Sequence, residues 1–234
     1  IYYKPVWSKY RINNYGIHDY CINKYYINNY HIKKAFNKRA LMQDLIKKAG
    51  QVKLLVMDVD GILSNGQIIY DANGIETKAF SVQDGVGVKS LARYGILTAI
   101  ITGRSSPMVD KRAAEMGVNH IVQGRDDKLI ALNELLAPLD PALNITAADC
   151  AYLGDDLPDI KAMQTVGFAA TVPNAHAEVI KRSHMVTTRA GGTGAVREIC
   201  DLILKGHGHY QDFIASYTLD EDKTQDHLSW ILVF

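Results

Sequence analysis

The chain has 234 residues, of which 47% are hydrophobic and 22% are charged, with a formal net charge of +1. This composition excludes a disordered polar chain, and no apolar run approaches the roughly 20 residues that cross a bilayer, so we expect no membrane partner. Cys21, Cys150 and Cys200 lack the spacing of a zinc site or a disulfide framework, which favours a cytoplasmic protein.

The N-terminal arm is strongly basic. Residues 1–50 carry ten Lys/Arg and two Asp/Glu, whereas the remainder carries 16 and 23. Basic arms are typical of some nucleic-acid-binding proteins, and tyrosines among lysines can stack on single-stranded bases. Residues 1–38, however, show no periodicity and no nucleic-acid-binding motif. We therefore expect a poorly ordered or accessory extension and no nucleic-acid partner.

The first strand ends in two acidic residues. A short helix is expected over 39–49, and the apolar strand that follows it ends at Met57 within VKLLVMDVDG. Asp58 and Asp60 come next, and side chains two residues apart on an extended segment point the same way. Adjacent carboxylates repel each other and are costly to desolvate, so a divalent cation is the simplest compensation. The alternative is an acidic turn without a ligand.

The rest of the chain alternates strands and helices after a hairpin. Strand-like runs over 66–71 and 75–80 flank Asn73-Gly74, a pair typical of hairpin turns. Helices are then expected over 86–95, 106–116, 126–139, 157–164, 175–181 and 194–205, and strands over 96–102, 119–123, 150–154, 166–170 and 184–188. This alternation predicts a parallel sheet with helices on both faces and a ligand site at the carboxyl ends of its strands.

Two other strand ends and one helix start carry polar groups. Thr102, Gly103 and Arg104 follow a strand, and a hydroxyl, a close backbone approach and a guanidinium suit an anion. The alternative is an ordinary Thr-Gly turn. Lys128 lies near the start of a predicted helix, where a lysine is most often a solvated charge.

Three carboxylates follow the strand CAYLG. Asp155, Asp156 and Asp159 lie within five residues of one another. A helix N-terminus explains one acid well, because acids cap helices and favour the dipole. It explains three acids poorly, which indicates a cation here as well.

The four motifs, in order DVDG, TG, a lone Lys and GDD with a further Asp, resemble those of the haloacid dehalogenase superfamily of phosphotransferases. The resemblance implies a three-layer α/β/α, Rossmann-like parallel sheet. The intervals between the motifs leave little room for a cap domain, so we expect a capless fold with the hairpin as a flap. The expected division is an extension (1–38), a phosphatase domain (39–206) and a C-terminal tail (207–234), which is either disordered or a docking segment.

The residues also suit phosphoryl transfer. Asp58 is placed as a nucleophile that forms an aspartyl phosphate, and Asp60 as the acid and then the base. The resemblance implies that Mg²⁺ is held by Asp58, the Asp60 backbone carbonyl and Asp155. Thr102 and Gly103 would bind phosphoryl oxygens.

Three further residues complete this prediction. Lys128 would offset the charge that collects at the phosphoryl group. Asp159 would orient the metal ligands or Lys128 from behind, and Asp156 is either a supporting residue or a helix cap.

The resemblance becomes closer over about 45–206. The stretches GILSNGQIIYDANGIETKAFSVQDGVGVKSL, IITGRSSPMVDKRAAEMG, YLGDDLPD and RAGGTGAVREICDLIL are similar to capless members that hydrolyse the 8-phosphate of a carboxylated eight-carbon sugar in lipopolysaccharide precursor synthesis. Membership implies a Mg²⁺-dependent homotetramer. It also implies substrate contacts from Ser81, Val82, Gln83, Asp84, Gly85, Lys89, Arg104 and Arg112.

One residue departs from the family pattern. Many members carry arginine where this chain has Gln83, so the identity of the sugar stays open. The alternatives are a capless phosphatase of a nine-carbon sialic-type sugar 9-phosphate, or a non-catalytic scaffold of the same fold. The glycine-rich run 191–194 is expected to be a flexible turn before the last helix rather than a phosphate site.

Overall fold

The computed structural model describes residues 40–139 and 141–219, so the predictions for 1–38 and for 220–234 lie outside it. The chain divides into a unit of residues 1–43 and a unit of residues 44–234. A helix over 40–49 crosses this boundary, and the second unit contains the sheet. Among the described residues, no helix combines the length and the apolar character needed to span a bilayer.

A six-stranded parallel sheet forms the centre of the second unit, as the alternating pattern predicted. Its order is β5-β4-β1-β6-β7-β8. The strands are β1 (Leu54–Met57), β4 (Leu97–Ile101), β5 (His120–Val122), β6 (Cys150–Leu153), β7 (Phe168–Thr171) and β8 (Met185–Val186). All four residues of β1 are buried, because helices cover both faces of the sheet.

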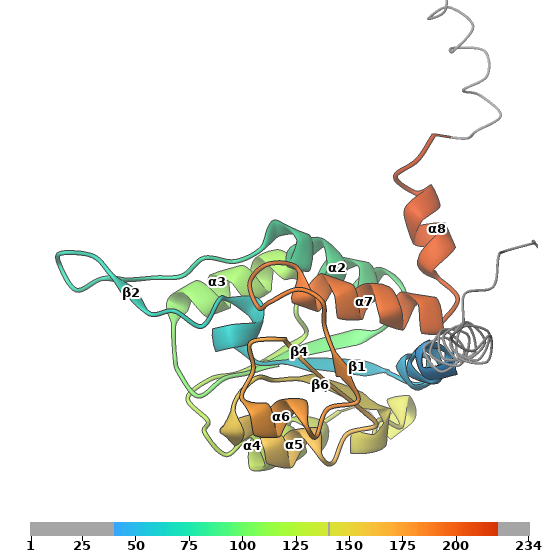
Figure 1. Cartoon of the computed structure of the whole chain (residues 1–234), viewed down its shortest axis with the longest axis horizontal. Helices are drawn as coiled ribbons and strands as arrows, with labels where there is room; N and C mark the ends of the chain where they lie inside the picture. Colours follow the sequence, from blue (N-terminus) through green and yellow to red (C-terminus); the bar gives the residue numbers. More distant parts are fainter. Residues whose placement is uncertain (1–39, 140, 220–234) are drawn as a thin grey trace, which may run out of the picture. The chain divides into compact units, whose positions relative to one another are not determined.

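Two layers of helices cover the sheet, so the three-layer expectation is confirmed (Figure 1). One layer contains α2 (Val82–Arg93), α3 (Pro107–Met116) and α7 (Ala195–Gly206). The other contains α4 (Lys128–Leu136), α5 (Ile160–Met163) and α6 (Ala177–Ile180). Short 3-10 turns lie at Pro141–Leu143, Ala147–Asp149 and Leu157–Asp159, and a kinked helical turn spans Val59–Leu63.

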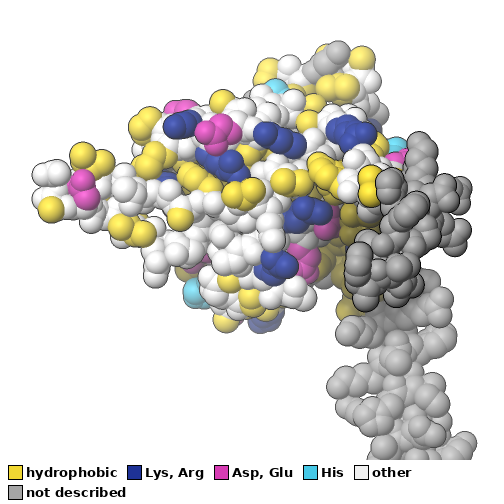
Figure 2. Space-filling model, turned by 90° about the horizontal axis from the view of Figure 1, so that it is seen from above, with side chains coloured by type: hydrophobic (Ala, Val, Ile, Leu, Met, Phe, Trp, Pro, Cys, Tyr) yellow, Lys and Arg dark blue, Asp and Glu magenta, His cyan; other side chains and the backbone are white. Residues whose placement is uncertain are grey.

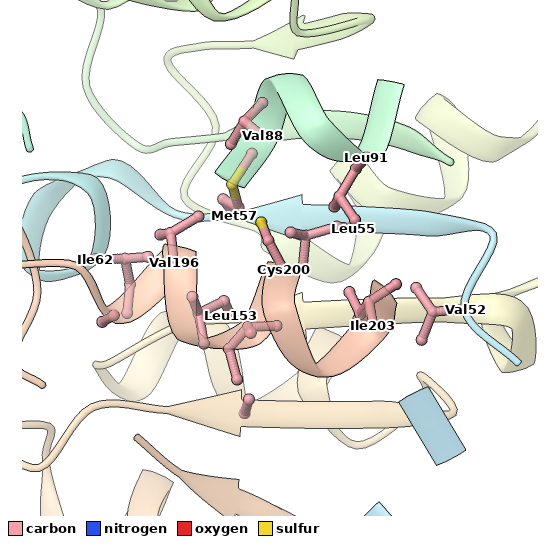
Figure 3. Packing of buried hydrophobic residues seen from close by; sticks show 14 of the residues in the cluster. Val52, Leu55, Met57, Ile62, Val88, Leu91, Leu153, Val196, Cys200 and Ile203 are labelled. Carbon is pink, nitrogen blue, oxygen red and sulfur yellow. The ribbon is translucent and has the colours of Figure 1, made fainter. Parts of the chain in front are cut away.

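The strand period sorts the core into two clusters. Leu55 and Met57 belong to the cluster beneath α2 and α7, whereas Leu54 and Val56 belong to the cluster beneath α4 and α5. Figure 3 shows side chains of α7 and α2 packed against β1, among them Cys200. Packing on both faces fixes β1 and therefore the direction in which the chain leaves it.

Helix α2 begins four residues before the expected start at 86. The expected helix contained Gly87 but not Gly85, and glycine is unfavourable inside a helix. The observed helix contains both, at positions where neighbouring residues come close. A Cβ on Gly85 would lie 2.5 Å from the Arg112 guanidinium, and one on Gly87 would lie 3.1 Å from the Cys200 Cβ on α7. Tertiary packing therefore outweighs helix propensity here.

The predicted hairpin is present, with shorter strands than expected: β2 is Ile69–Tyr70 and β3 is Glu76–Thr77. Asp71 Oδ1 accepts hydrogen bonds from the backbone amides of Asn73 and Ile75 and so closes the turn. The hairpin projects from the body of its unit (Figure 1). Between β1 and β4 the chain contains only the kinked turn, this hairpin and α2, so the capless fold is confirmed.

The described part of the tail packs on the core. After α7 the chain forms α8 (Tyr210–Ala215), whose Phe213 is buried beneath the guanidinium of Arg197 at 5.4 Å. The ring of His209 stacks on that of Tyr94 at 4.6 Å. Residues 207–219 therefore contact the helical layer of α2 and α7, whereas the expected domain boundaries stay predictions.

Candidate active site

The candidate site lies where three neighbouring strands end. In the sheet β1 lies between β4 and β6, and Met57 pairs with both Ile100 and Leu153. The residues that follow these strands therefore come out at one edge of the sheet. Asp58 and Asp60 follow β1, and the segments that follow β4 and β6 carry the other predicted groups.

Asp58 and Lys128 form a buried ion pair across 70 residues of sequence. Lys128 Nζ lies 2.6 Å from Asp58 Oδ1 and donates a second hydrogen bond to the Ile101 carbonyl oxygen at 2.8 Å. Asp58 is 8% exposed and Lys128 is 4% exposed, so water contributes little to either charge. The alternative of a solvated helical lysine does not describe Lys128.

Asp155 belongs to an acidic cluster with Asp58. Carboxylate oxygens of Asp58, Asp155 and Asp159 lie within 4.8 Å of one another. Asp155 Oδ1 is buried and has no hydrogen-bond partner among the described residues. An all-oxygen set of clustered acids with an orphaned lone pair suits a hard divalent cation such as Mg²⁺.

Gly61 makes room for Asp155. Its φ is +96°, and a Cβ at this position would lie 2.0 Å from Asp155 Oδ2. The glycine of the DVDG motif therefore serves both a left-handed turn and a close approach between the ends of β1 and β6.

The crowding of acids shifts their protonation. Burial, then the charge of Asp159, raises the pKa of Asp58 from 3.8 to about 7, although Lys128 opposes the shift. Burial, then the charge of Asp58, raises the pKa of Asp155 to about 7. Without a cation, both acids thus hold protons up to near-neutral pH. A bound cation would favour their ionised forms.

Asp159 supports Lys128 and the neighbouring loop. Its Oδ1 lies 3.6 Å from Lys128 Nζ and accepts a hydrogen bond from the buried Tyr152 hydroxyl at 3.0 Å. Its Oδ2 accepts hydrogen bonds from the amides of Asp155 and Asp156. The Asp156 carboxylate accepts one from the Leu157 amide at 2.8 Å, as expected of a helix cap. Tyr152, which the sequence pattern marks only as core, is thus part of the support.

A pocket of about 260 Å³ opens over these groups. The residues that line it are Asp58, Asp60, Thr102, Gly103, Arg104, Asp126, Lys128, Asp156, Pro158 and Asp159. The structure thus brings the groups after β1 and β4, Lys128 and part of the acid cluster into one cavity. Sequence reasoning missed Asp126, which lies 2.5 Å from where a Cβ on Gly103 would be.

The Asp60 carboxylate faces the hairpin. Its Oδ1 accepts hydrogen bonds from Lys78 Nζ at 2.5 Å and from Ser64 Oγ at 3.3 Å. Glu76 Oε1 lies 3.2 Å from Lys78, and Glu76 Oε2 accepts from Arg104 Nη2 at 2.6 Å. Sequence reasoning missed both Glu76 and Lys78, because neither follows a strand of the main sheet.

The predicted substrate loop does not line this pocket. Val82, Gln83 and Lys89 are exposed, and Gln83 Oε1 accepts a hydrogen bond from Arg189 Nη1 at 2.5 Å. Gln83 instead lines a second cavity of about 340 Å³, with Thr188, Arg189, Gly194, Arg197, Glu198 and Asp201. Substrate contacts from this loop therefore stay a prediction.

Two charged residues near this loop have partners within the fold. Asp84 is 1% exposed, and its Oδ1 accepts a hydrogen bond from the Arg197 amide at the start of α7. This carboxylate takes the place that a phosphate would need at the N-terminus of α7. Arg112 donates a hydrogen bond to the Ser81 carbonyl oxygen at 2.9 Å.

Known proteins share both this sequence and this fold. A family profile described as haloacid dehalogenase-like hydrolase matches residues 115–199. The chain is 46% identical over 165 residues to the 3-deoxy-D-manno-octulosonate 8-phosphate phosphatase of Escherichia coli K12. This match covers 70% of this chain and 86% of that protein. It is 45% identical over 161 residues to the Yersinia pestis enzyme of the same name, covering 69% and 84%.

Solved structures agree with these sequence matches. A crystal structure of 3-deoxy-D-manno-octulosonate 8-phosphate phosphatase from Moraxella catarrhalis, in complex with magnesium, phosphate and a KDO molecule, has 53% identity and a TM-score of 0.72 over 76% of this chain and 99% of that one. A cobalt-bound Haemophilus influenzae phosphatase of this type has 35% identity and a TM-score of 0.67, covering 73% and 97%.

Proposed function

The chain belongs to the 3-deoxy-D-manno-octulosonate 8-phosphate (KDO 8-phosphate) phosphatases, within the haloacid dehalogenase-like hydrolases, and from this we propose that it hydrolyses KDO 8-phosphate to KDO and inorganic phosphate with Mg²⁺. The reaction would serve the synthesis of a lipopolysaccharide precursor. The observation that carries the proposal is the convergence on Asp58, at the end of β1, of Lys128 from α4 and of Asp155 from the end of β6: Lys128 pairs with Asp58 in the pocket, and Asp155 clusters with it.

In the first step Asp58 attacks phosphorus. Its Oδ1 accepts a hydrogen bond from Lys128, which fixes the carboxylate just after the end of β1. A bond forms between Asp58 and phosphorus while the bond to the sugar oxygen breaks in line with it, and Asp60 donates a proton to that oxygen. In the second step Asp60 removes a proton from water, whose oxygen attacks phosphorus and releases Asp58. The configuration at phosphorus is inverted at each step.

The phosphoryl oxygens need compensation for their charge. Thr102 and Gly103 line the pocket, and their hydroxyl and amide would donate hydrogen bonds to these oxygens, while Lys128 supplies a positive charge beside Asp58. Asp58, Asp155 and the Asp60 backbone carbonyl would hold Mg²⁺. When bound, the ion supplies charge neutralisation between Asp58 and the phosphoryl group.

Phosphate release from a substrate panel tests the function. With Mg²⁺, we expect kcat/KM for KDO 8-phosphate to exceed that for a nine-carbon sialic-type sugar 9-phosphate by at least about tenfold. The site must bind the phosphate and the carboxylate of one sugar together, and the distance between these two groups differs between the two substrates. The reverse preference would establish the alternative sugar, which Gln83 left open. If no phosphate were released from any sugar phosphate, the alternative of a non-catalytic scaffold would be supported.

Association of several copies is part of the proposal. The hairpin exposes Ile68, Ile69, Tyr70 and Ile75 at 47–60%, and Figure 2 shows hydrophobic side chains gathered on this projecting segment at the left of the view. Exposed apolar groups of this kind favour contact with another surface. We expect the mass of a homotetramer by light scattering. The mass of a single chain would contradict it.

The free, buried Cys150 and Cys200 support a reducing, cytoplasmic location.

A further inference from the structure

Lys78 lies one residue beyond β3, on the return arm of the hairpin, and its side chain is 1% exposed. A buried ammonium group is costly unless partners compensate it. Its partners are Asp60 Oδ1 at 2.5 Å and Glu76 Oε1 at 3.2 Å. Lys78, a residue of the hairpin, thus forms an ion pair with Asp60, the carboxylate that transfers protons in the proposed mechanism.

Four side chains of alternating charge close a ring beside the pocket. Asp60 contacts Lys78, Lys78 contacts Glu76, and Glu76 Oε2 accepts a hydrogen bond from Arg104 at 2.6 Å. The ring closes where Arg104 Nε lies 4.0 Å from Asp60 Oδ2. Its members come from the turn after β1, the hairpin and the segment after β4. The ring therefore ties the hairpin to the pocket.

The two oxygens of Asp60 have different surroundings. Oδ1 has two donors, Lys78 at 2.5 Å and Ser64 Oγ at 3.3 Å. Among the described residues, Oδ2 accepts no hydrogen bond, and Arg104 Nε lies 4.0 Å from it, beyond hydrogen-bond distance. Rotation of the carboxylate would break its short contact with Lys78. Oδ2 is thus the oxygen left for substrate and water.

We propose that Lys78 is a positioning residue: by holding Oδ1 it presents Oδ2 of Asp60 to the reacting oxygens. This rests on the proposed function. In the first step the proton of Oδ2 passes to the sugar O8 as its bond to phosphorus breaks and the bond to Asp58 forms. In the second, Oδ2 takes a proton from water as the water oxygen binds phosphorus and the bond to Asp58 breaks.

The leaving group distinguishes positioning from a structural anchor. A sugar alkoxide is a poor leaving group and needs the proton of Asp60, whereas p-nitrophenolate leaves without one. A residue that acts through Asp60 therefore affects the sugar phosphate and spares the first step with p-nitrophenyl phosphate. A residue that only anchors the hairpin, or binds phosphate, affects both substrates alike.

Lys78→Met tests this, because it keeps most of the aliphatic stem and removes the ammonium group. For KDO 8-phosphate we expect kcat to fall about 100-fold, with KM within about threefold of wild type. With p-nitrophenyl phosphate we expect a rapid burst of p-nitrophenolate at close to the wild-type rate, followed by slow turnover. The phosphoenzyme would accumulate because its hydrolysis needs Asp60. Lys78→Arg should recover part of kcat, since it keeps the charge.

The controls separate the possible failures. Lys111→Met removes an exposed lysine of α3 outside the pocket and should leave both substrates unaffected. Ser64→Ala removes the weaker donor to Oδ1 and should show a smaller loss with the same dependence on the leaving group, which tests the proposal even where Lys78→Met unfolds. Equal losses in sugar-phosphate turnover and in the aryl burst, or an unchanged kcat, would overturn the role of Lys78. A wild-type protein without turnover would overturn the proposed function itself.

Discussion

Replacement of Asp58 by asparagine is expected to lower kcat for KDO 8-phosphate by at least about 10⁴-fold, because it removes the atom that attacks phosphorus. The fold should persist. Asparagine has nearly the same volume and its carbonyl oxygen can still accept the hydrogen bond from Lys128, which lies 2.6 Å from Asp58 Oδ1. Stopped assays of phosphate release and acid-quench measurements of phosphoenzyme give the readout.

A magnesium titration separates loss of the nucleophile from loss of the metal. Asp155→Asn removes a proposed ligand, so its activity should rise with Mg²⁺ concentration beyond the point where wild type saturates. Asp58→Asn should stay inactive at every concentration. Asp110→Asn makes the same chemical change on the exposed face of α3 and should behave as wild type. Full turnover in Asp58→Asn would refute the nucleophile and with it the mechanism.

Removal of divalent cations is expected to stop turnover and to make stability fall as pH rises. Burial and neighbouring acids raise the pKa of Asp58 and Asp155 from 3.8 to about 7 in the folded chain without metal. The folded state then binds more protons than the unfolded state, so the contribution of these acids to the free energy of unfolding declines between about pH 4 and pH 7. Since 1 kcal/mol changes Tm by about 2–4 °C in a chain of this size, this decline should lower Tm by several degrees.

Thermal unfolding in a chelator, at several pH values from about 4.5 to about 7.5, measures this effect. Other acids titrate over part of this range, so the comparison with Asp155→Asn isolates the cluster: its Tm should depend less on pH than that of wild type. Saturating Mg²⁺ should raise the wild-type Tm most at neutral pH, where it binds carboxylates that otherwise repel one another. A Tm insensitive to Mg²⁺ at neutral pH would contradict a metal site at these residues.

The sequence predicted the fold class and the edge of the sheet that carries the candidate site for one physical reason. In a parallel sheet, the carboxyl ends of the strands lie at the same edge. Asp58, Thr102 and Asp155 stand at the ends of predicted strands, whereas the order β4-β1-β6, which makes these strands neighbours, comes from the structure. Lys128 could be placed only through the resemblance, since a lysine at a helix start has no strand end to mark it.

Other features depended on contacts that no local pattern reveals. Lys78 lies in a hairpin, where a lysine usually faces solvent, yet its side chain is buried against Asp60. A substrate contact from Asp84 stays a prediction, and no local pattern indicated its partner in the fold: it is buried in α2, and its carboxylate accepts a hydrogen bond from the Arg197 amide, 113 residues away at the start of α7. Tyr152 reads as core in a strand, and only the fold shows its hydroxyl at Asp159.

The two strands of the hairpin carry two kinds of side chain close together. Ile69, Tyr70 and Ile75 are exposed, whereas Lys78, next to the residue that pairs with Ile69, is buried against Asp60 and Glu76. If the exposed residues pack between copies, dilution that separates the subunits also frees the strand that leads to Lys78. Specific activity would then depend on enzyme concentration instead of being a constant of the chain. Cellular abundance would, through this hairpin, set the efficiency of each molecule as well as the number of molecules.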